Sequence, residues 1–137
     1  MAGNEKWQFL HCDDFPPTRS LVKMVVEAES PADVTGADDF PEVRRLVESG
    51  RFFDAVLVDA SLTHGNIDTF EPQTGVEVAR YIRSAGMKVG LCSAQTLVGD
   101  LMKLANKIGV RVYNPADYQK IGIHYAFLDI LSDSRDE

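Results

Sequence analysis

The sequence lacks features that mark several large classes of protein. It has no cluster of lysine and arginine, and its formal net charge is −7. Binding to a nucleic-acid backbone or to an anionic membrane surface is therefore disfavoured. No apolar run approaches the roughly 18 residues that span a bilayer. The opening residues MAGNEK contain no signal-peptide core, so we expect a cytoplasmic protein.

Cysteine is also scarce. Cys12 and Cys92 both lie in apolar, strand-like runs, which predicts two small buried thiols rather than a disulfide. No Cys/His spacing typical of a metal site occurs.

The chain has 137 residues, of which 45% are hydrophobic and 26% charged. These values predict one globular domain over residues 1–137, with frayed tails at 1–6 and 132–137.

Short apolar runs alternate with helix-like periods along the chain. Strands are predicted at 7–12, 33–38, 54–58, 89–92 and 110–113. Helices are predicted to begin at Pro16, Pro41 and Gly75, and to cover 95–108 and 116–131. This strict alternation predicts an α/β fold with a doubly wound, five-stranded parallel sheet. The expected strand order is 2-1-3-4-5, as in flavodoxin-like folds.

Carboxylates end two of the predicted strands. Asp13 and Asp14 follow the first strand, and Asp59 follows the third. In a sheet of this order, the carboxyl ends of those strands flank the point where ligands bind. Three carboxylates repel one another there unless a cation or a phosphoryl group brings them together. Carboxylate oxygens are suitable ligands for Mg²⁺. Ser93 and Asn114 directly follow the fourth and fifth strands, at the same edge.

Simpler structural roles for these residues remain open at this point. Asp13 and Asp14 also suit the N-terminus of a helix, where acidic side chains favour the helix dipole. Ser93 also suits a helix cap. His11 lies in a predicted strand, which favours a packing role over ligation. An aspartate-dependent phosphatase would need a second carboxylate two residues after its nucleophile, and Ser61 occupies that place after Asp59.

Taken together, these motifs resemble a response-regulator receiver domain over residues 9–131. The resemblance depends on the acidic pair, Asp59, the helix segment GVEVARYIR, the CSA after the fourth strand and the NP after the fifth. It implies that Mg²⁺ is held by Asp13, Asp14, Asp59 and the backbone carbonyl of Ser61. It also implies that Asp59 accepts a phosphoryl group from a phosphohistidine, with Ser93 contacting a phosphoryl oxygen.

The function implied by the resemblance is signal transduction in a two-component phosphorelay. The implied partners are a sensor histidine kinase or a phosphotransfer protein, and a downstream protein that receives the signal. The implied protein is not an enzyme beyond self-catalysed phosphotransfer and dephosphorylation. Because the 137 residues contain no DNA-binding or enzymatic output module, we expect a stand-alone receiver whose output is protein–protein contact, with a fragment of a larger protein as the open alternative.

Three departures from the family pattern favour an alternative, a pseudo-receiver that binds proteins without being phosphorylated. Asn114 stands where the family has lysine, and a neutral donor binds a phosphoryl group less strongly than a charged one. Arg111 stands where the switch aromatic is expected, so either it reaches the phosphate or the aromatic switch is absent. Sixteen positions separate Asp59 from Gly75, about twice the usual gap, and we expect the loop over 63–74 to gate or block access.

The last predicted helix carries two apolar stripes on different faces. One stripe can pack on the sheet, whereas the other needs a partner or remains exposed. A partner surface or homodimer interface is predicted here, although simple exposure of a few apolar side chains is the open alternative. The residues predicted for this interface are Tyr118, Ile123, Phe127 and Ile130.

Overall fold

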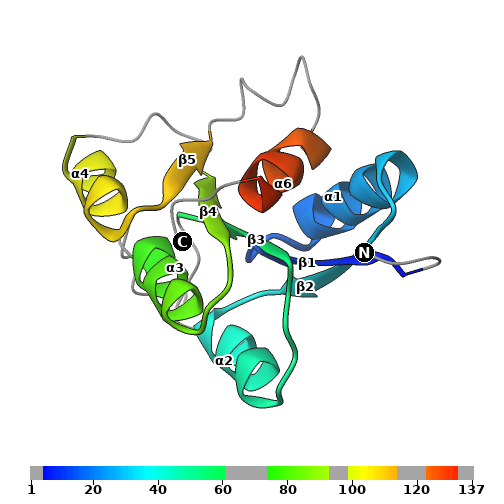
Figure 1. Cartoon of the computed structure of the whole chain (residues 1–137), viewed down its shortest axis with the longest axis horizontal. Coiled ribbons are helices and arrows are strands. Elements are labelled where there is room, and N and C mark those ends of the chain that lie inside the picture. Colours follow the sequence, from blue (N-terminus) through cyan, green and yellow to red (C-terminus); the bar gives the residue numbers. More distant parts are fainter. Residues whose placement is uncertain (1–4, 61–73, 93–98, 114–122, 133–137) are drawn as a thin grey trace.

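The computed structural model describes residues 5–60, 74–92, 99–113 and 123–132, apart from the side chains of 74, 99–102 and 104. The described strands and helices alternate along the chain (Figure 1). The strands are β1 (Trp7–Cys12), β2 (Ala32–Ala37), β3 (Ala55–Asp59), β4 (Val89–Cys92) and β5 (Arg111–Tyr113). The helices are α1 (Pro16–Glu29), α2 (Phe40–Glu48), α3 (Thr74–Ser84), α4 (Gly99–Ile108) and α6 (His124–Leu131).

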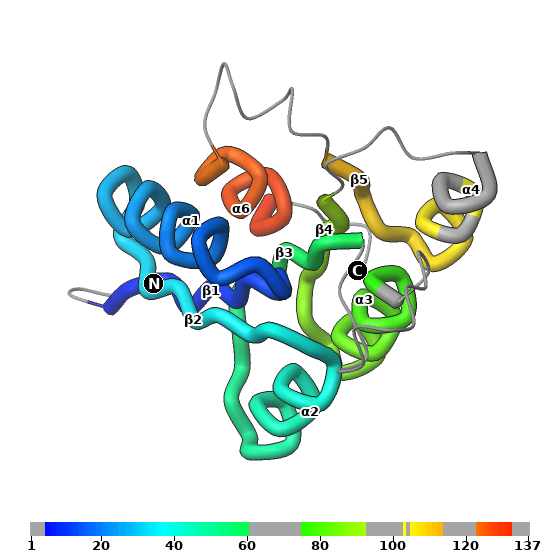
Figure 2. Tube along the Cα trace, turned by 180° about the vertical axis from the view of Figure 1, so that it is seen from behind, coloured from blue at the N-terminus to red at the C-terminus, as the bar shows by residue number. Residues whose placement is uncertain are grey.

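The strands pair in parallel in the order β2-β1-β3-β4-β5, which confirms the predicted fold. Helices α1 and α6 lie on one face of the sheet, and α2, α3 and α4 lie on the other (Figures 1 and 2). Because all of the strands are parallel, their carboxyl ends meet at one edge. That edge is where the predicted site residues fall.

The centre of the sheet is apolar because helices cover both of its faces. Val56, Leu57 and Val58 of β3 are completely buried, as predicted from the unbroken AVLV run. Side chains of alternate strand residues contribute to two separate clusters. Val56 and Val58 pack under α2, α3 and α4, whereas Leu57 packs under α1 and α6. Burial of these side chains supplies most of the free energy that holds the layers together.

Several element boundaries agree with those expected from sequence. Strands β1 and β4 have the predicted bounds, and α1 begins at Pro16, where proline loses no helical hydrogen bond. Strand β2 begins one residue earlier than predicted and continues through Gly36. Neither Cys12 nor Cys92 forms a disulfide; Cys12 is buried as predicted, whereas Cys92 is only partly buried. Within the described residues, no helix has both the length and the apolar character that a membrane span requires.

The packing of α6 corrects one prediction. Phe127 and Ile130 face the sheet and are 0% and 2% exposed, so the prediction that these two side chains form a partner surface is wrong. Phe127 stacks on Phe9 of β1, with ring centroids 4.7 Å apart. A Cβ atom at Gly90 would lie 2.8 Å from Cδ1 of Ile130, so the missing side chain at Gly90 makes room for the helix.

The remaining predicted interface residues divide into two cases. Ile123 is half-buried and packs against the same cluster as Phe127. Tyr118 lies outside the described residues. The outward side of α6 instead carries Tyr125 and Leu128, which are 48% and 39% exposed. Among the described residues, the stripe without a covering element is therefore the one opposite to Phe127.

Substitution at Phe127 tests this assignment. Phe127→Ala should lower the free energy of unfolding by about 3–5 kcal/mol, because it removes a ring packed between β1 and α6. Leu128→Ala, on the exposed side of the same helix, should change it by less than about 1 kcal/mol. Urea unfolding measured by circular dichroism distinguishes the two. Equal losses would show that both sides of α6 are buried.

Candidate functional site

Asp13, Asp14 and Asp59, called here the acidic cluster, lie at the carboxyl ends of two adjacent strands. Strands β1 and β3 pair directly, and the last pair in their register joins Cys12 to Val58. Asp13 and Asp59 each follow that pair by one residue, so the two backbones are level at the sheet edge. The strand order therefore brings these acids together, as the sequence predicted.

The backbone and side chain of Asp13 are held by three hydrogen bonds to two neighbouring segments. Its N–H donates to the carbonyl of Ala37 on β2 at 3.0 Å. Its carboxylate Oδ1 accepts from the N–H of Phe15 at 2.8 Å, and its carbonyl accepts from Nη1 of Arg19 at 2.6 Å. Asp13 is 6% exposed. The first acid of the cluster is therefore fixed in place by β2 and by the start of α1.

Burial and like charge both act on the ionisation of the cluster. Burial raises the pKa of Asp13 to about 6, and the nearby charges of Asp59 and Asp14 act in the same direction. The hydrogen bond from the Phe15 N–H opposes this rise. Burial, followed by the charge of Asp59, also raises the pKa of Asp14. The carboxylates are therefore close enough to repel one another when they are ionised.

His11 and Arg19 are neighbours of the cluster that sequence reasoning did not identify. His11 is 3% exposed, and its Nε2 lies 3.8 Å from Oδ2 of Asp13. Burial, followed by the charge of Arg19, lowers the pKa of His11 to about 4, so its imidazole is neutral at neutral pH. The available sequence signal was the spacing of His11 and Asp13 by two residues, which places both on one face of a strand.

Gly75 brings the start of α3 back against the end of β3. Its N–H donates to the carbonyl of Ala60 at 3.2 Å. A Cβ atom at this position would lie 2.4 Å from the carbonyl oxygen of Asp59, closer than real contacts allow. Glycine is therefore required for the two backbones to meet. The predicted loop over 63–74 lies outside the described residues except at Thr74, where α3 begins.

Arg111, a predicted phosphate-contacting residue, has a partner on α6. Its Nη1 donates to Oδ2 of Asp129, and the hydroxyl of Tyr113 donates to the same oxygen at 2.5 Å. Arg111 pairs with Gly90, two residues before the end of the β4–β5 register. Contact between Arg111 and a phosphoryl group stays a prediction. The other predicted site residues Ser61, Ser93 and Asn114 lie outside the described residues.

The described residues do not contain a preformed metal site. Within them, no group of three or more His, Cys, Asp or Glu side chains is arranged so that it could hold a metal ion. The acidic cluster supplies the right kind of ligand, since hard cations such as Mg²⁺ prefer carboxylate oxygens. Its side chains would have to turn toward a common point in order to bind one.

The raised pKa of Asp13 gives a pH-dependent prediction. A carboxyl whose pKa rises on folding favours the folded state below its unfolded pKa, and this contribution is lost as pH rises through about 6. The free energy of unfolding of Asp13→Asn should therefore match that of wild type near pH 4. Near pH 7, without metal, it should exceed the wild-type value by roughly 2–3 kcal/mol. Urea unfolding at both pH values measures the difference.

A surface carboxylate provides the control for this experiment. Asp33 is exposed and lies 3.7 Å from Lys6, an arrangement that contributes little to stability. Asp33→Asn should change the free energy of unfolding by less than about 1 kcal/mol at either pH. If Asp13→Asn behaves in the same way, the carboxylate of Asp13 is not destabilised in the folded protein.

Comparison with known proteins identifies the fold. No protein-family model and no curated protein matches the chain. Solved structures do match. A response regulator from Thermotoga maritima is 21% identical with a TM-score of 0.71, over 94% of this chain and 100% of that one.

Two further solved structures lead to the same fold. The signal receiver domain of the putative response regulator NarL from Mycobacterium tuberculosis is 24% identical with a TM-score of 0.71, over 93% of this chain and 97% of that one. A CheY-like receiver domain protein from Methanospirillum hungatei JF-1 is 19% identical with a TM-score of 0.68, over 92% of this chain and 97% of that one. The chain therefore has the fold of response-regulator receiver domains.

Proposed function

We propose that the chain is an atypical receiver domain in phosphorelay signal transduction, with Asp59 as the residue that accepts a phosphoryl group. The observation that carries the proposal is the acidic cluster at the edge between β1 and β3. Asp59 is the last residue of β3, and its charge adds to burial, the larger cause, in raising the pKa of both Asp13 and Asp14. A receiver fold together with three interacting carboxylates at this edge favours phosphoryl transfer over the other functions considered.

In the proposed mechanism, the Asp59 carboxylate attacks the phosphorus atom of a phosphohistidine. The phosphorus–nitrogen bond breaks, and an acyl phosphate forms on Asp59. Asp13, Asp14, Asp59 and the backbone carbonyl of Ser61 would bind Mg²⁺. When bound, that ion supplies positive charge that offsets the charge of the carboxylates and of the incoming phosphoryl group. The hydrogen bond from the Phe15 N–H uses one lone pair of Oδ1 of Asp13, so the carboxylate keeps further acceptor sites for an ion.

The proposed partners are a sensor histidine kinase or a phosphotransfer protein as donor, and a downstream protein as target. The outward side of α6, with Tyr125 and Leu128, replaces Phe127 and Ile130 as the part of the helix available for protein contact. Homodimer formation through this side is included in the proposal. The chemistry at Asp59 is limited to self-catalysed phosphotransfer and dephosphorylation.

The second candidate function is a pseudo-receiver that binds proteins and accepts no phosphoryl group. The observation that favours it is Asn114, which lacks the positive charge that a phosphoryl group would meet at this position. The long segment between Asp59 and Gly75 favours it as well. In this case the acidic cluster would be a remnant, and only the surface would be used.

Phosphoryl analogues separate the two functions. With Mg²⁺ and beryllofluoride at millimolar concentration, amide resonances at Asp13, Asp59 and Ala60 should shift, because the analogue binds to the Asp59 carboxylate. Acetyl phosphate should add one phosphoryl group by mass spectrometry. Asp59→Asn should abolish both responses. A folded wild-type protein that responds to neither reagent would favour the pseudo-receiver.

The lifetime of the modification tests the role of Asn114. Asn114→Lys should lengthen the life of phosphorylated Asp59 by about fivefold to tenfold, because a charge-assisted bond is roughly twice as strong as a neutral one. The decay of phosphorylated protein measured on Phos-tag gels gives the lifetime. Asn106→Lys, an exposed position on α4, is the matched control and should leave it unchanged. An unchanged lifetime in Asn114→Lys would eliminate the missing charge as the limiting factor.

A further inference from the structure

The carbonyl of Asp13 lies where the sheet stops supplying partners. The last pair in the β1–β2 register joins Cys12 to Ala37, and β2 ends at Ala37. The N–H of Asp13 still donates to the carbonyl of Ala37, but β2 has no further residue that could donate to the carbonyl of Asp13. Nη1 of Arg19 donates to this carbonyl instead, at 2.6 Å. A side chain of α1 therefore takes the place of a missing strand N–H.

This hydrogen bond acts on two members of the acidic cluster at once. The carbonyl of Asp13 belongs to the planar peptide unit that leads into Asp14, so holding the carbonyl also fixes the direction in which the chain enters Asp14. The guanidinium of Arg19 is charged, and charge-assisted hydrogen bonds are stronger than neutral ones. Burial is the main cause that raises the pKa of Asp13 and Asp14, and the charge of Arg19 opposes that rise for both. Arg19 is thus linked to both acids by geometry and by charge.

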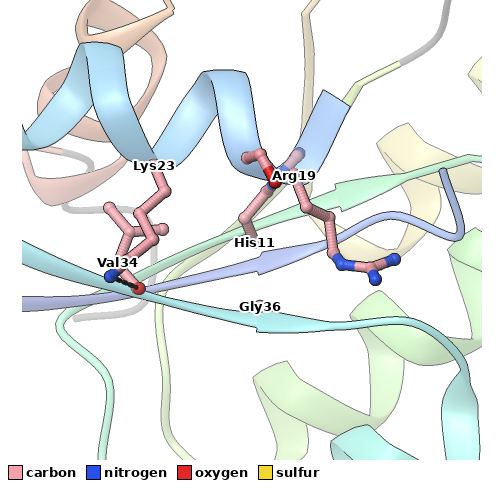
Figure 3. A pocket seen from close by; sticks show the side chains of 6 residues that line it. His11, Arg19, Lys23, Val34 and Gly36 are labelled. Carbon is pink, nitrogen blue, oxygen red and sulfur yellow. Dashed lines mark hydrogen bonds between the residues drawn. The ribbon is translucent and has the colours of Figure 1, made fainter. Parts of the chain in front are cut away.

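The side chain of Arg19 reaches this carbonyl from the first turn of α1. Its own N–H donates to the carbonyl of Phe15 at 3.1 Å, and the residue is half-buried. Arg19 and Lys23 both line the cavity drawn in Figure 3, where the two side chains diverge. Lys23 runs to the carbonyl of Val34, at 2.9 Å, whereas the guanidinium of Arg19 points away from Lys23. Of these two cations, Arg19 is the one that contacts the acidic cluster.

Gly36 of β2 gives the stem of Arg19 room to pass. A Cβ atom at Gly36 would lie 3.1 Å from Cδ of Arg19, which is tighter than most real contacts, and 3.5 Å from its Nε. Gly36 is not among the glycines with a positive φ, so the backbone conformation does not require glycine here. The absent side chain instead lets the arginine lie against the strand on its way to the carbonyl of Asp13.

We propose that Arg19 is a positioning residue of the acidic cluster, which holds the carbonyl of Asp13 so that Asp13 and Asp14 keep a fixed placement at the sheet edge. Gly36 is the position that admits it. The proposal rests on the proposed function, because it concerns the carboxylates that would bind Mg²⁺. Arg19 acts through the backbone and is not itself a ligand. Through charge alone it would oppose a cation, since like charges repel. The two effects of Arg19 on Mg²⁺ binding therefore have opposite signs, and experiment can separate them.

The positioning can be tested without metal. Nitrogen-15 relaxation of the full chain gives the order parameter of the Asp14 N–H, which belongs to the peptide unit that Arg19 holds. This value should be about 0.85 in wild type and should fall in Arg19→Met, which keeps the length of the side chain but removes its donors. Arg45→Met, the same substitution in an exposed ion pair on α2, is the matched control and should leave it unchanged. An unchanged order parameter in Arg19→Met overturns the proposal.

The affinity for Mg²⁺ shows whether this placement serves the site. Amide shifts of Asp13 and Asp59 during Mg²⁺ titration give the dissociation constant. Arg19→Met should bind Mg²⁺ at least about tenfold more weakly than wild type, an effect typical of losing a group that orients metal ligands. If Arg19 acts through its charge alone, Arg19→Met binds Mg²⁺ more tightly, and tighter or unchanged binding overturns the proposal. A folded wild type that binds no Mg²⁺ counts against the proposed function, and the order parameter of Asp14 then decides the role of Arg19.

Gly36→Val gives a test in which no charge changes. Valine suits a strand, and its branches would occupy the space of the Arg19 stem, so Mg²⁺ binding should weaken here as well. The double variant Arg19→Met/Gly36→Val should bind Mg²⁺ no more weakly than Arg19→Met, because both changes break the same contact. Undiminished binding in Gly36→Val, or losses that add in the double variant, overturns the proposal. If Gly36→Val fails to fold, Arg19→Met decides the matter.

Discussion

Repulsion among carboxylates at one edge of the sheet is the constraint on which the functional interpretation depends. The pairing of β1 with β3 brings Asp13 level with Asp59, and the hydrogen bonds from Asp13 to Ala37 and from Phe15 to Asp13 hold it there. The folded chain therefore keeps a local excess of negative charge that free side chains would avoid. A cation that enters this edge gains the energy of relieving that repulsion.

Much of the fold was predictable because local pattern and chain order determine it. The unbroken apolar run of β3 and the alternation of strands and helices were enough to predict the parallel sheet and the meeting of the acids at its edge. The buried face of α6 was not predictable, because both of its stripes are apolar. The choice between them is made by Phe9 and by the space at Gly90, which belong to distant strands. The roles of His11 and Arg19 were not predicted either, because they depend on contacts with Asp13 that form only in the folded chain.

Asp129 of α6 connects the helix to β5. One of its two partners is Arg111, which stands where the receiver pattern has an aromatic residue. Its Oδ2 accepts from both Arg111 and Tyr113, and the Tyr113 ring lies within contact distance of the Cβ position at Gly90. One carboxylate thus joins two side chains of a short edge strand to the helix above it. Charge-assisted bonds of this kind are among the stronger ones. Movement of β5 relative to α6 would have to break them.

The close contact at Gly75 has a consequence for how this protein can vary. Because Ala60 and Gly75 meet through a backbone hydrogen bond, whatever chain joins them leaves and returns at nearly the same place. The entropy lost on closing such an excursion grows only with the logarithm of its length, at about 0.6 kcal/mol per doubling. The join between β3 and α3 is therefore a tolerant insertion point. A foreign epitope or a reporter peptide placed there would be displayed beside the carboxyl edge of the sheet.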